Sequence, residues 1–213
     1  MFELIVISHE AMLPGEAAII QQLFEAGLEI FHLRKPGASE QAIRALLDAI
    51  PAMYHDRIAL HGFHQLVNEY EIRRLHFTEV HRLETNETIW SQLWDKNYIL
   101  STSVHELSVL QTLSHSFRYT FFSPLFDSLS KPGYKGIEEE GFYLGQECKP
   151  VPVIALGGID ADNMEKVAAM NFDGAAVLGT IWNDPAKAVD NFKKVKISEE
   201  IIWLNNQHSY RRK

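Results

Sequence analysis

The sequence contains a single cysteine, Cys148, among its 213 residues. One cysteine excludes an internal disulfide and is typical of proteins from a reducing compartment. No apolar run approaches the roughly 18 residues that a membrane-spanning helix needs. Residues 1–8 also lack the basic segment and the long apolar stretch of a secretory signal. These absences predict a cytoplasmic protein that does not enter a membrane.

The sequence has fewer positive than negative side chains. It contains 20 Lys and Arg residues and 28 Asp and Glu residues, which give a formal net charge of −8. This balance argues against extended binding to nucleic acid or to anionic membranes. An anionic small molecule would therefore need a local positive site. The chain also lacks a Walker loop and a dinucleotide-binding glycine fingerprint.

Short strand-like segments alternate with helix-like segments along the chain. The apolar pattern predicts eight strands, at 4–8, 29–34, 57–61, 74–78, 98–103 and 118–123, and within 151–159 and 173–180. Helical periodicity and capping residues predict helices between the strands, among them 65–71, 84–96 and 138–146, and a last helix that begins near Pro185. The segment from Pro124 to Gly136 is rich in Pro and Gly and predicts an irregular loop.

Eight strand–helix pairs of about 25 residues each predict an α/β fold of the (β/α)8 TIM-barrel type. We expect a single domain over residues 1–213, near the short end for such barrels, with a frayed tail at about 205–213. The alternative is an open doubly wound sheet, which needs fewer strands and usually has a glycine-rich first turn. Residues 8–12, where that turn would lie, contain no glycine.

Two stretches near the C-terminus carry the strongest functional signal. The predicted strands within 151–159 and 173–180 both end in glycine, as Gly157-Gly158 and Gly179-Thr180. Glycine lets the backbone approach a ligand closely and present its N–H groups. Neighbouring parallel strands that end in this way predict a phosphate cradle, which a barrel places after strands seven and eight.

Polar side chains follow the other predicted strands. Because the carboxyl ends of barrel strands meet at one mouth, we expect a polar ring there, made of Ser8, Arg34, Lys35, His61, Thr78, Glu79, Ser103, His105 and Ser123. The following loop adds Ser128, Ser130 and Lys131 near the same mouth.

Each of these signals has a plainer interpretation. Gly157-Gly158 can form a tight turn in which Asp160 caps the next helix. Arg34 and Lys35 can be solvated cations, and the loop serines can be ordinary turn residues. His32, His76 and His105 can be core or surface histidines. Phosphate binding is favoured by the joint placement of these residues at strand ends, not by any one of them.

Metal binding and nucleophilic chemistry have weaker support. Four histidines, at 61, 64, 76 and 81, cluster in the sequence with Glu79, but their spacing matches no standard zinc pattern. Cys148 precedes the seventh predicted strand, on the side away from the mouth, which argues against a nucleophilic role.

The ordered motifs resemble the thiamine phosphate synthase family, which includes the closely related thiazole tautomerases. The resemblance covers nearly the whole chain and is strongest in Phe122–Phe126 with Ser128–Lys131, then in Pro152–Ile159 and Asp173–Trp182. Weaker support comes from His32–Lys35 and Ser101–His105.

The resemblance implies a β/α barrel that joins a hydroxymethylpyrimidine pyrophosphate to a thiazole phosphate in thiamine biosynthesis. Pyrophosphate leaves first, and the thiazole nitrogen captures the pyrimidine cation. Such chemistry needs stabilisation of negative charge and positioning of two reactants more than it needs a strong base. The resemblance also implies phosphorylated small molecules as partners and permits a homo-oligomer.

The resemblance implies roles for particular residues of this chain. Gly158, Gly179 and Thr180 would hold the thiazole phosphate next to Gly157, and Ser128, Ser130 and Lys131 would contact phosphate or pyrophosphate. Arg34 and Ser103 would face the pyrimidine, with Lys131, Arg34 and Ser103 as the catalytic candidates. His32 stands where the family usually has glutamine, and Lys35 is a further substrate-binding candidate.

This chain differs from the family at the positions that the resemblance assigns to magnesium and pyrophosphate binding. His61-Gly62 replaces an Asn-Asp pair, His81 replaces an aspartate, and Pro36 stands where a lysine is expected. The resemblance implies Mg²⁺, which prefers oxygen ligands. Glu79 is the one candidate ligand, and the sequence leaves open whether Glu79 or Lys35 compensates.

Three functions follow as hypotheses. The first is a thiamine phosphate synthase-type transferase. The second is a non-catalytic or regulatory binder of thiazole phosphate or thiamine phosphate, suggested by the missing carboxylates. The third is another phosphate-handling barrel enzyme such as an isomerase, for which Glu79 is the only candidate base at a strand end. A histidine that the tautomerases carry in the segment of Ser123 is absent here, which argues against tautomerase chemistry.

Overall fold

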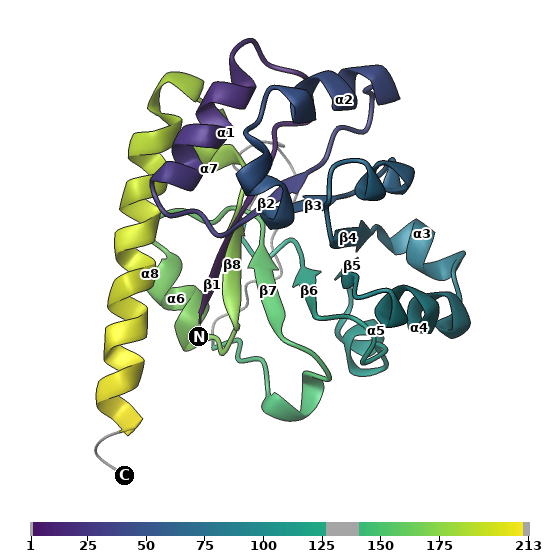
Figure 1. The fold of residues 1–213 in the computed structure, drawn as a ribbon. Coiled ribbons are helices and arrows are strands. Elements are labelled where there is room, and N and C mark those ends of the chain that lie inside the picture. Colours follow the sequence, from purple (N-terminus) through teal and green to yellow (C-terminus); the bar gives the residue numbers. More distant parts are fainter. Residues whose placement is uncertain (1, 127–140, 211–213) are drawn as a thin grey trace.

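The computed structural model describes residues 2–126 and 141–210. Its centre is a closed barrel in which eight parallel strands pair in chain order and β8 pairs with β1 (Figure 1). The strands are β1 Glu3–Ile7, β2 Ile30–Leu33, β3 Ile58–Leu60, β4 Arg74–Phe77, β5 Ile99–Val104, β6 Tyr119–Phe122, β7 Val153–Leu156 and β8 Gly174–Val177. The (β/α)8 fold class predicted from the sequence is confirmed.

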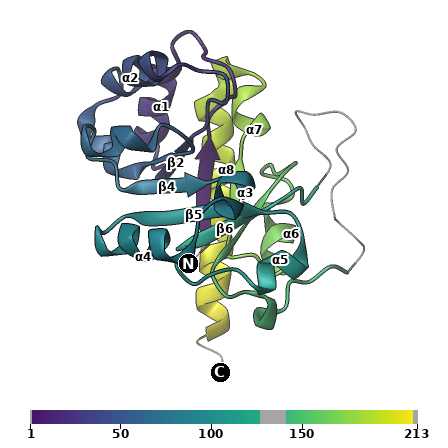
Figure 2. The same ribbon diagram turned by 90° about the vertical axis from the view of Figure 1, so that its right-hand side faces the viewer.

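The helices surround the barrel, and several are short (Figure 2). They are α1 Glu16–Glu25, α2 Glu40–Asp48, α3 Glu79–Leu83, α4 Glu87–Asp95, α5 Leu107–Gln111, α6 Met164–Ala169, α7 Gly179–Trp182 and α8 Ala188–Tyr210. Short 3₁₀ helices lie at Ala52–Arg57, His64–Asn68, Gln146–Cys148 and Pro185–Lys187. Among the described residues, none of the helices combines the length and the apolar character that crossing a bilayer requires.

Several predicted helices differ in the structure. The helix expected at 84–96 is present as α4, which begins at Glu87 because Asn86 caps it by accepting a hydrogen bond from a backbone N–H. The preceding helix α3, capped in the same way by Thr78, was not predicted. The helix expected at 65–71 is a 3₁₀ helix over His64–Asn68. Residues 138–140 lie outside the described residues, and 141–145 are not helical, since Gly141 has a φ of 83°.

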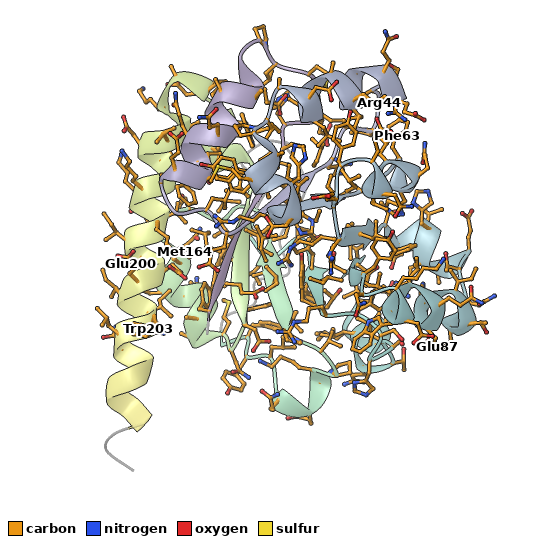
Figure 3. The ribbon with its side chains drawn as sticks, in the orientation of Figure 1. Arg44, Phe63, Glu87, Met164, Glu200 and Trp203 are labelled. Carbon is orange, nitrogen blue, oxygen red and sulfur yellow. The ribbon has the colours of Figure 1, made fainter. Side chains whose placement is uncertain are left out.

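Helix α8 begins directly after the 3₁₀ helix that contains Pro185 and continues to Tyr210. It runs along one side of the barrel, and its C-terminal end extends beyond the barrel (Figures 1 and 2). Met164 of α6 is fully buried near α8, whereas Trp203, farther along α8, is 40% exposed (Figure 3). The helix therefore includes most of the segment for which the sequence predicted a frayed tail.

Apolar side chains fill two layers of the protein. One cluster lies between the strands and the surrounding helices, and a smaller one fills the barrel interior. At the seam between β1 and β8, a Cβ on Gly174 would lie 2.4 Å from the carbonyl oxygen of Glu3. Only glycine allows the backbones to approach this closely where the barrel closes.

Candidate active site at the barrel mouth

A cavity of about 700 Å³ opens at the C-terminal ends of the strands. The residues that line it come from the ends of all eight strands or from the loops that follow them, and they include Arg34, His61, His76, Glu79, Ser103, Gly157, Gly158, Gly179 and Thr180. This is the end of a β/α barrel at which enzymes of the fold place their active sites. Most of the strand-end residues singled out from the sequence therefore share one cavity.

The glycines after β7 and β8 lie together at this cavity. Gly157 and Gly158 both have positive φ, 109° and 64°. A Cβ on Gly157 would also lie 3.0 Å from Cα of Pro124, so this position needs glycine for its conformation and for its space. Within the part of the chain that the structure describes, the backbone N–H groups of Gly158 and Gly179 donate to no other backbone group. They remain available for an anion.

The plainer interpretation of the first glycine pair is also partly correct. Asp160 accepts hydrogen bonds from the N–H groups of Asp162 and Asn163, which stabilises the turn, but the N-cap position of α6 is Asn163. The side chain of Asn163 donates to the carbonyl of Gly158 at 2.8 Å. The hydroxyl of Thr180 donates to the carbonyl of Ile159. The Thr180 bond ties the two strand ends together, and the Asn163 bond holds the turn after β7.

Arg34 is held at the mouth by its backbone and by its guanidinium group. The buried hydroxyl of Ser8 donates to the carbonyl of Arg34 and accepts from its N–H, both at 2.8 Å. The guanidinium donates to Oε1 of Glu10 at 2.8 Å, and both side chains are partly exposed. Because an exposed ion pair is worth little, an anionic ligand can compete with Glu10 for this cation.

Lys35 does not line the mouth cavity, so its predicted contact with substrate gains no support from this geometry and stays a prediction. Its Nζ lies 2.6 Å from both carboxylate oxygens of Glu16 and donates to the carbonyl of Ala11 at 2.7 Å. Both charged side chains are buried. The Arg34-Lys35 pair is thus divided, since successive residues point in opposite directions where the chain leaves β2.

Three histidines cluster at the base of the cavity, where His61 and His76 line it and His32 contacts both of their rings. His32 on β2 and His76 on β4 are buried, while His61, directly after β3, is partly exposed. Nδ1 of His32 lies 2.8 Å from Nε2 of His61, and the ring of His61 stacks on that of His76 with centroids 3.8 Å apart. His32 is not among the residues that line the cavity, and its predicted contact with substrate stays a prediction.

Oxygen atoms surround this histidine cluster. The hydroxyl of Tyr119 lies 2.6 Å from Nε2 of His32, and Ser101 and Ser103 lie 3.0 and 3.1 Å from the two ring nitrogens of His76. Sequence reasoning missed Tyr119 and Ser101 as members of the site. The register of the strands explains their place in the site. His76, Ser101 and Tyr119 are aligned partners on β4, β5 and β6, so they form one layer of the barrel.

Burial sets the charge of the cluster. It lowers the pKa of His32 and of His61 well below the ordinary value of 6.5, with a further contribution from His76 in each case. Burial, with smaller effects of His64 and Arg34, lowers the pKa of His76 to about 3. The imidazoles are therefore neutral at physiological pH.

Acid is expected to destabilise the fold through this cluster. The unfolded chain takes up protons on these histidines below about pH 6.5, whereas folded His76 stays neutral down to about pH 3. Stability is thus fully present above the unfolded pKa and is lost as the pH falls through this window. The unfolding free energy of the parent protein should fall between about pH 8 and pH 5. In His76→Asn this fall should be smaller by about 2 kcal/mol.

This prediction is checked by urea unfolding at several pH values with EDTA present, so that no cation competes with protons for the imidazoles. His115→Gln is the matched control, because His115 is exposed and far along the chain from the cluster. A His76→Asn slope equal to that of the parent and the control would contradict the assigned burial effect.

The remaining site residues fall into two groups. Ser103 and Glu79 line the cavity, and Glu79 also pairs with Arg82 at 3.4 Å. Ser128, Ser130 and Lys131 lie outside the described residues. Their predicted contacts with phosphate or pyrophosphate stay predictions.

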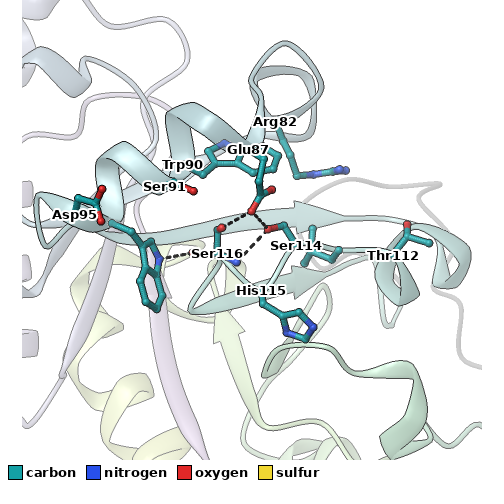
Figure 4. A pocket seen from close by; sticks show the side chains of 11 residues that line it. Arg82, Glu87, Trp90, Ser91, Asp95, Thr112, Ser114, His115 and Ser116 are labelled. Atoms are coloured by element: carbon teal, nitrogen blue, oxygen red, sulfur yellow. Dashed lines mark hydrogen bonds between the residues drawn. The ribbon is translucent and has the colours of Figure 1, made fainter.

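A second cavity, of about 800 Å³, lies on the outside of the barrel between α4 and residues 112–116 (Figure 4). Glu87 accepts hydrogen bonds there from the hydroxyls of Ser114 and Ser116, at 2.8 and 2.7 Å. Although slightly larger, this cavity contains none of the strand-end residues, so the chemistry is assigned to the barrel mouth.

Known proteins resemble this chain in sequence and in fold. Thiamine-phosphate synthase from Pyrococcus abyssi is 29% identical over 109 residues, which are 50% of this chain and 52% of that protein. The enzyme of the same name from Leuconostoc citreum is 24% identical over 76% of this chain and 79% of its own length. The chain thus matches about half the length of some curated relatives and more of others.

A solved structure covers more of the chain. Thiamine phosphate pyrophosphorylase from Bacteroides thetaiotaomicron is 29% identical, with a TM-score of 0.74 over 94% of this chain and 98% of that one. The model of the family described as thiamine monophosphate synthase matches residues 4–181, which include the strand ends that line the mouth cavity. This chain therefore belongs to the thiamine monophosphate synthase family.

Proposed function

We propose that this protein is a thiamine phosphate synthase. It would join hydroxymethylpyrimidine pyrophosphate to thiazole phosphate, giving thiamine phosphate and pyrophosphate. The observation that carries the proposal is the shared cavity of Gly158 and Gly179, whose N–H groups donate to no other backbone group among the described residues. A cradle of this kind suits the phosphate of the thiazole substrate.

The other lining residues suit the second substrate. Arg34 supplies a cation at the mouth, and Ser103 supplies a hydroxyl that lines the same cavity. Loss of pyrophosphate places growing negative charge on the leaving group, and fixed donors lower the energy of that transition state. Apolar neighbours such as Phe121 and Leu156 line the same cavity and would exclude water from the pyrimidine cation.

The family generally depends on Mg²⁺. The described residues do not fit a hard cation, because their one close group of metal-binding side chains consists of three histidines and no carboxylate. Glu79 and Glu10 both line the mouth, but neither belongs to a group of three or more metal-binding side chains among the described residues. No step of the proposed reaction is therefore assigned to Mg²⁺.

The proposal is tested by incubating the pure protein with both substrates, with and without Mg²⁺, and measuring thiamine phosphate. We expect product above the uncatalysed background. Folded protein that binds thiazole phosphate by calorimetry but forms no product would overturn the transferase proposal. That outcome would instead favour the non-catalytic binder of thiazole phosphate or thiamine phosphate.

A further inference from the structure

We propose that His32, His61 and His76 bind one divalent transition-metal ion, of the Zn²⁺ class, at the floor of the mouth cavity. One ring nitrogen from each histidine can be chosen so that all three atoms lie within 4.8 Å of one another. Three protein ligands with an open fourth position is the arrangement of catalytic zinc sites. The spacing in the sequence hides this group, because the ligands come from β2, from β4 and from the residue that follows β3.

The position of the cluster in the barrel supports binding by nitrogen. Barrel interiors are usually filled with branched apolar side chains, and burying three imidazoles in their place costs free energy unless they gain partners. Neutral imidazole is the form that binds metal. The group contains no carboxylate or thiolate among the described residues, and three nitrogen ligands favour Zn²⁺ or Co²⁺ over Mg²⁺.

The hydrogen bonds around the cluster resemble the outer shell of a metal site. Metal-binding histidines usually donate their second N–H to an oxygen, which fixes the tautomer and the ring. With Nδ1 of His32 on the metal, its Nε2 still has the hydroxyl of Tyr119 at 2.6 Å. Whichever nitrogen of His76 binds, the other keeps a serine hydroxyl, Ser101 or Ser103.

Metal binding requires a small movement. Nδ1 of His32 and Nε2 of His61 lie 2.8 Å apart and share a hydrogen. Two imidazole nitrogens on a tetrahedral zinc, each about 2.0–2.1 Å from it, would lie about 3.3 Å apart. These two rings therefore need to separate by about half an ångström, and the shared hydrogen moves to the outer nitrogen of its own ring. The stacked rings of His61 and His76 also need to turn, because the lone pair of an imidazole nitrogen lies in the ring plane and nearly parallel rings do not aim theirs at one point.

The charge of the surroundings predicts what occupies the fourth position. Neutral imidazoles leave the full charge of the dication uncompensated, and Arg34 adds positive charge near His61 and His76. His61 and His76 line the cavity, so the open position faces the phosphate cradle. We therefore expect an anionic oxygen, from hydroxide or from a phosphate group, as the fourth ligand.

The test uses the full chain, stripped of metal with a chelator and then titrated with Co²⁺. We expect one Co²⁺ per chain with the intense visible bands of four-coordinate cobalt, displaced by Zn²⁺ and shifted when inorganic pyrophosphate is added. His76→Gln and His61→Asn should each weaken binding by more than the roughly 10–100-fold that loss of an outer-shell partner costs. His105→Gln, which changes a cavity residue outside the cluster, should bind as the parent does.

Circular dichroism is used to check that each variant is folded. If the buried substitution at His76 prevents folding, the His61→Asn variant alone provides the test. Folded parent protein that shows only the spectrum of hydrated Co²⁺ would overturn the proposal. Equal loss of binding in the His105→Gln control would overturn it too. Because binding is measured without turnover, this result is independent of whether the transferase assay succeeds.

Discussion

Lys35→Met is expected to lower the free energy of unfolding by about 3–5 kcal/mol, because it leaves the buried carboxylate of Glu16 without its cation. The side chains of Lys35 and Glu16 are 0% and 1% exposed, so water cannot replace the lost partner. Burial lowers the pKa of Lys35, although the hydrogen bond to Glu16 opposes that shift. The ammonium group is thus retained by its partner, and the two charges depend on each other.

The double variant Lys35→Met with Glu16→Gln separates charge from packing. It removes both charges while a side-chain oxygen remains to accept from the N–H of Leu13, as Glu16 does at 3.2 Å. We expect it to recover most of the lost stability, since removing both members of a buried pair is often close to neutral.

Urea unfolding measures these changes, with Lys187→Met as the matched control. Lys187 pairs with Asp184, but their side chains are 69% and 47% exposed. Removing this ion pair should therefore change the free energy of unfolding by no more than about 1 kcal/mol. A Lys35→Met effect as small as that of the control would show that the ion pair is unimportant. A double variant no more stable than the single one would show that packing, not charge, is responsible.

Arg34→Ala is expected to have the opposite profile, a loss of activity with little loss of stability. Removing a donor that faces developing negative charge typically costs about 10²–10³-fold in rate. The lost pair with Glu10 is partly exposed and should contribute no more than about 1 kcal/mol to stability.

Steady-state kinetics of thiamine phosphate formation test this expectation. A fall in kcat at nearly constant KM would mean that Arg34 acts on the leaving pyrophosphate in the transition state, whereas a rise in KM alone would mean ground-state binding. Arg57→Ala is the control, because Arg57 precedes β3 at the opposite end of the barrel and lies over the ring of Tyr54. Equal losses in the Arg34 and Arg57 variants would contradict a role for Arg34 at the site.

The sequence by itself determined the eight strands and their closure into a barrel. Apolar runs bounded by turn residues depend on local chemistry, which each segment carries with it. The glycines after strands seven and eight were also readable, because a positive φ such as that of Gly157 excludes most other residues. Helices were placed less well, since the helix expected at 84–96 begins only after its cap Asn86, and the short α3 before it was not predicted.

Only the tertiary structure decided which polar residues meet. Arg34 and Lys35 are neighbours whose side chains point in opposite directions as the chain leaves β2, but only the packed fold shows that one direction leads to the cavity and the other to Glu16. His32, His61 and His76 belong to different strands or strand ends and come together through the register of β2, β3 and β4. Local patterns report what a residue can do, whereas contacts between distant residues arise only when the barrel closes.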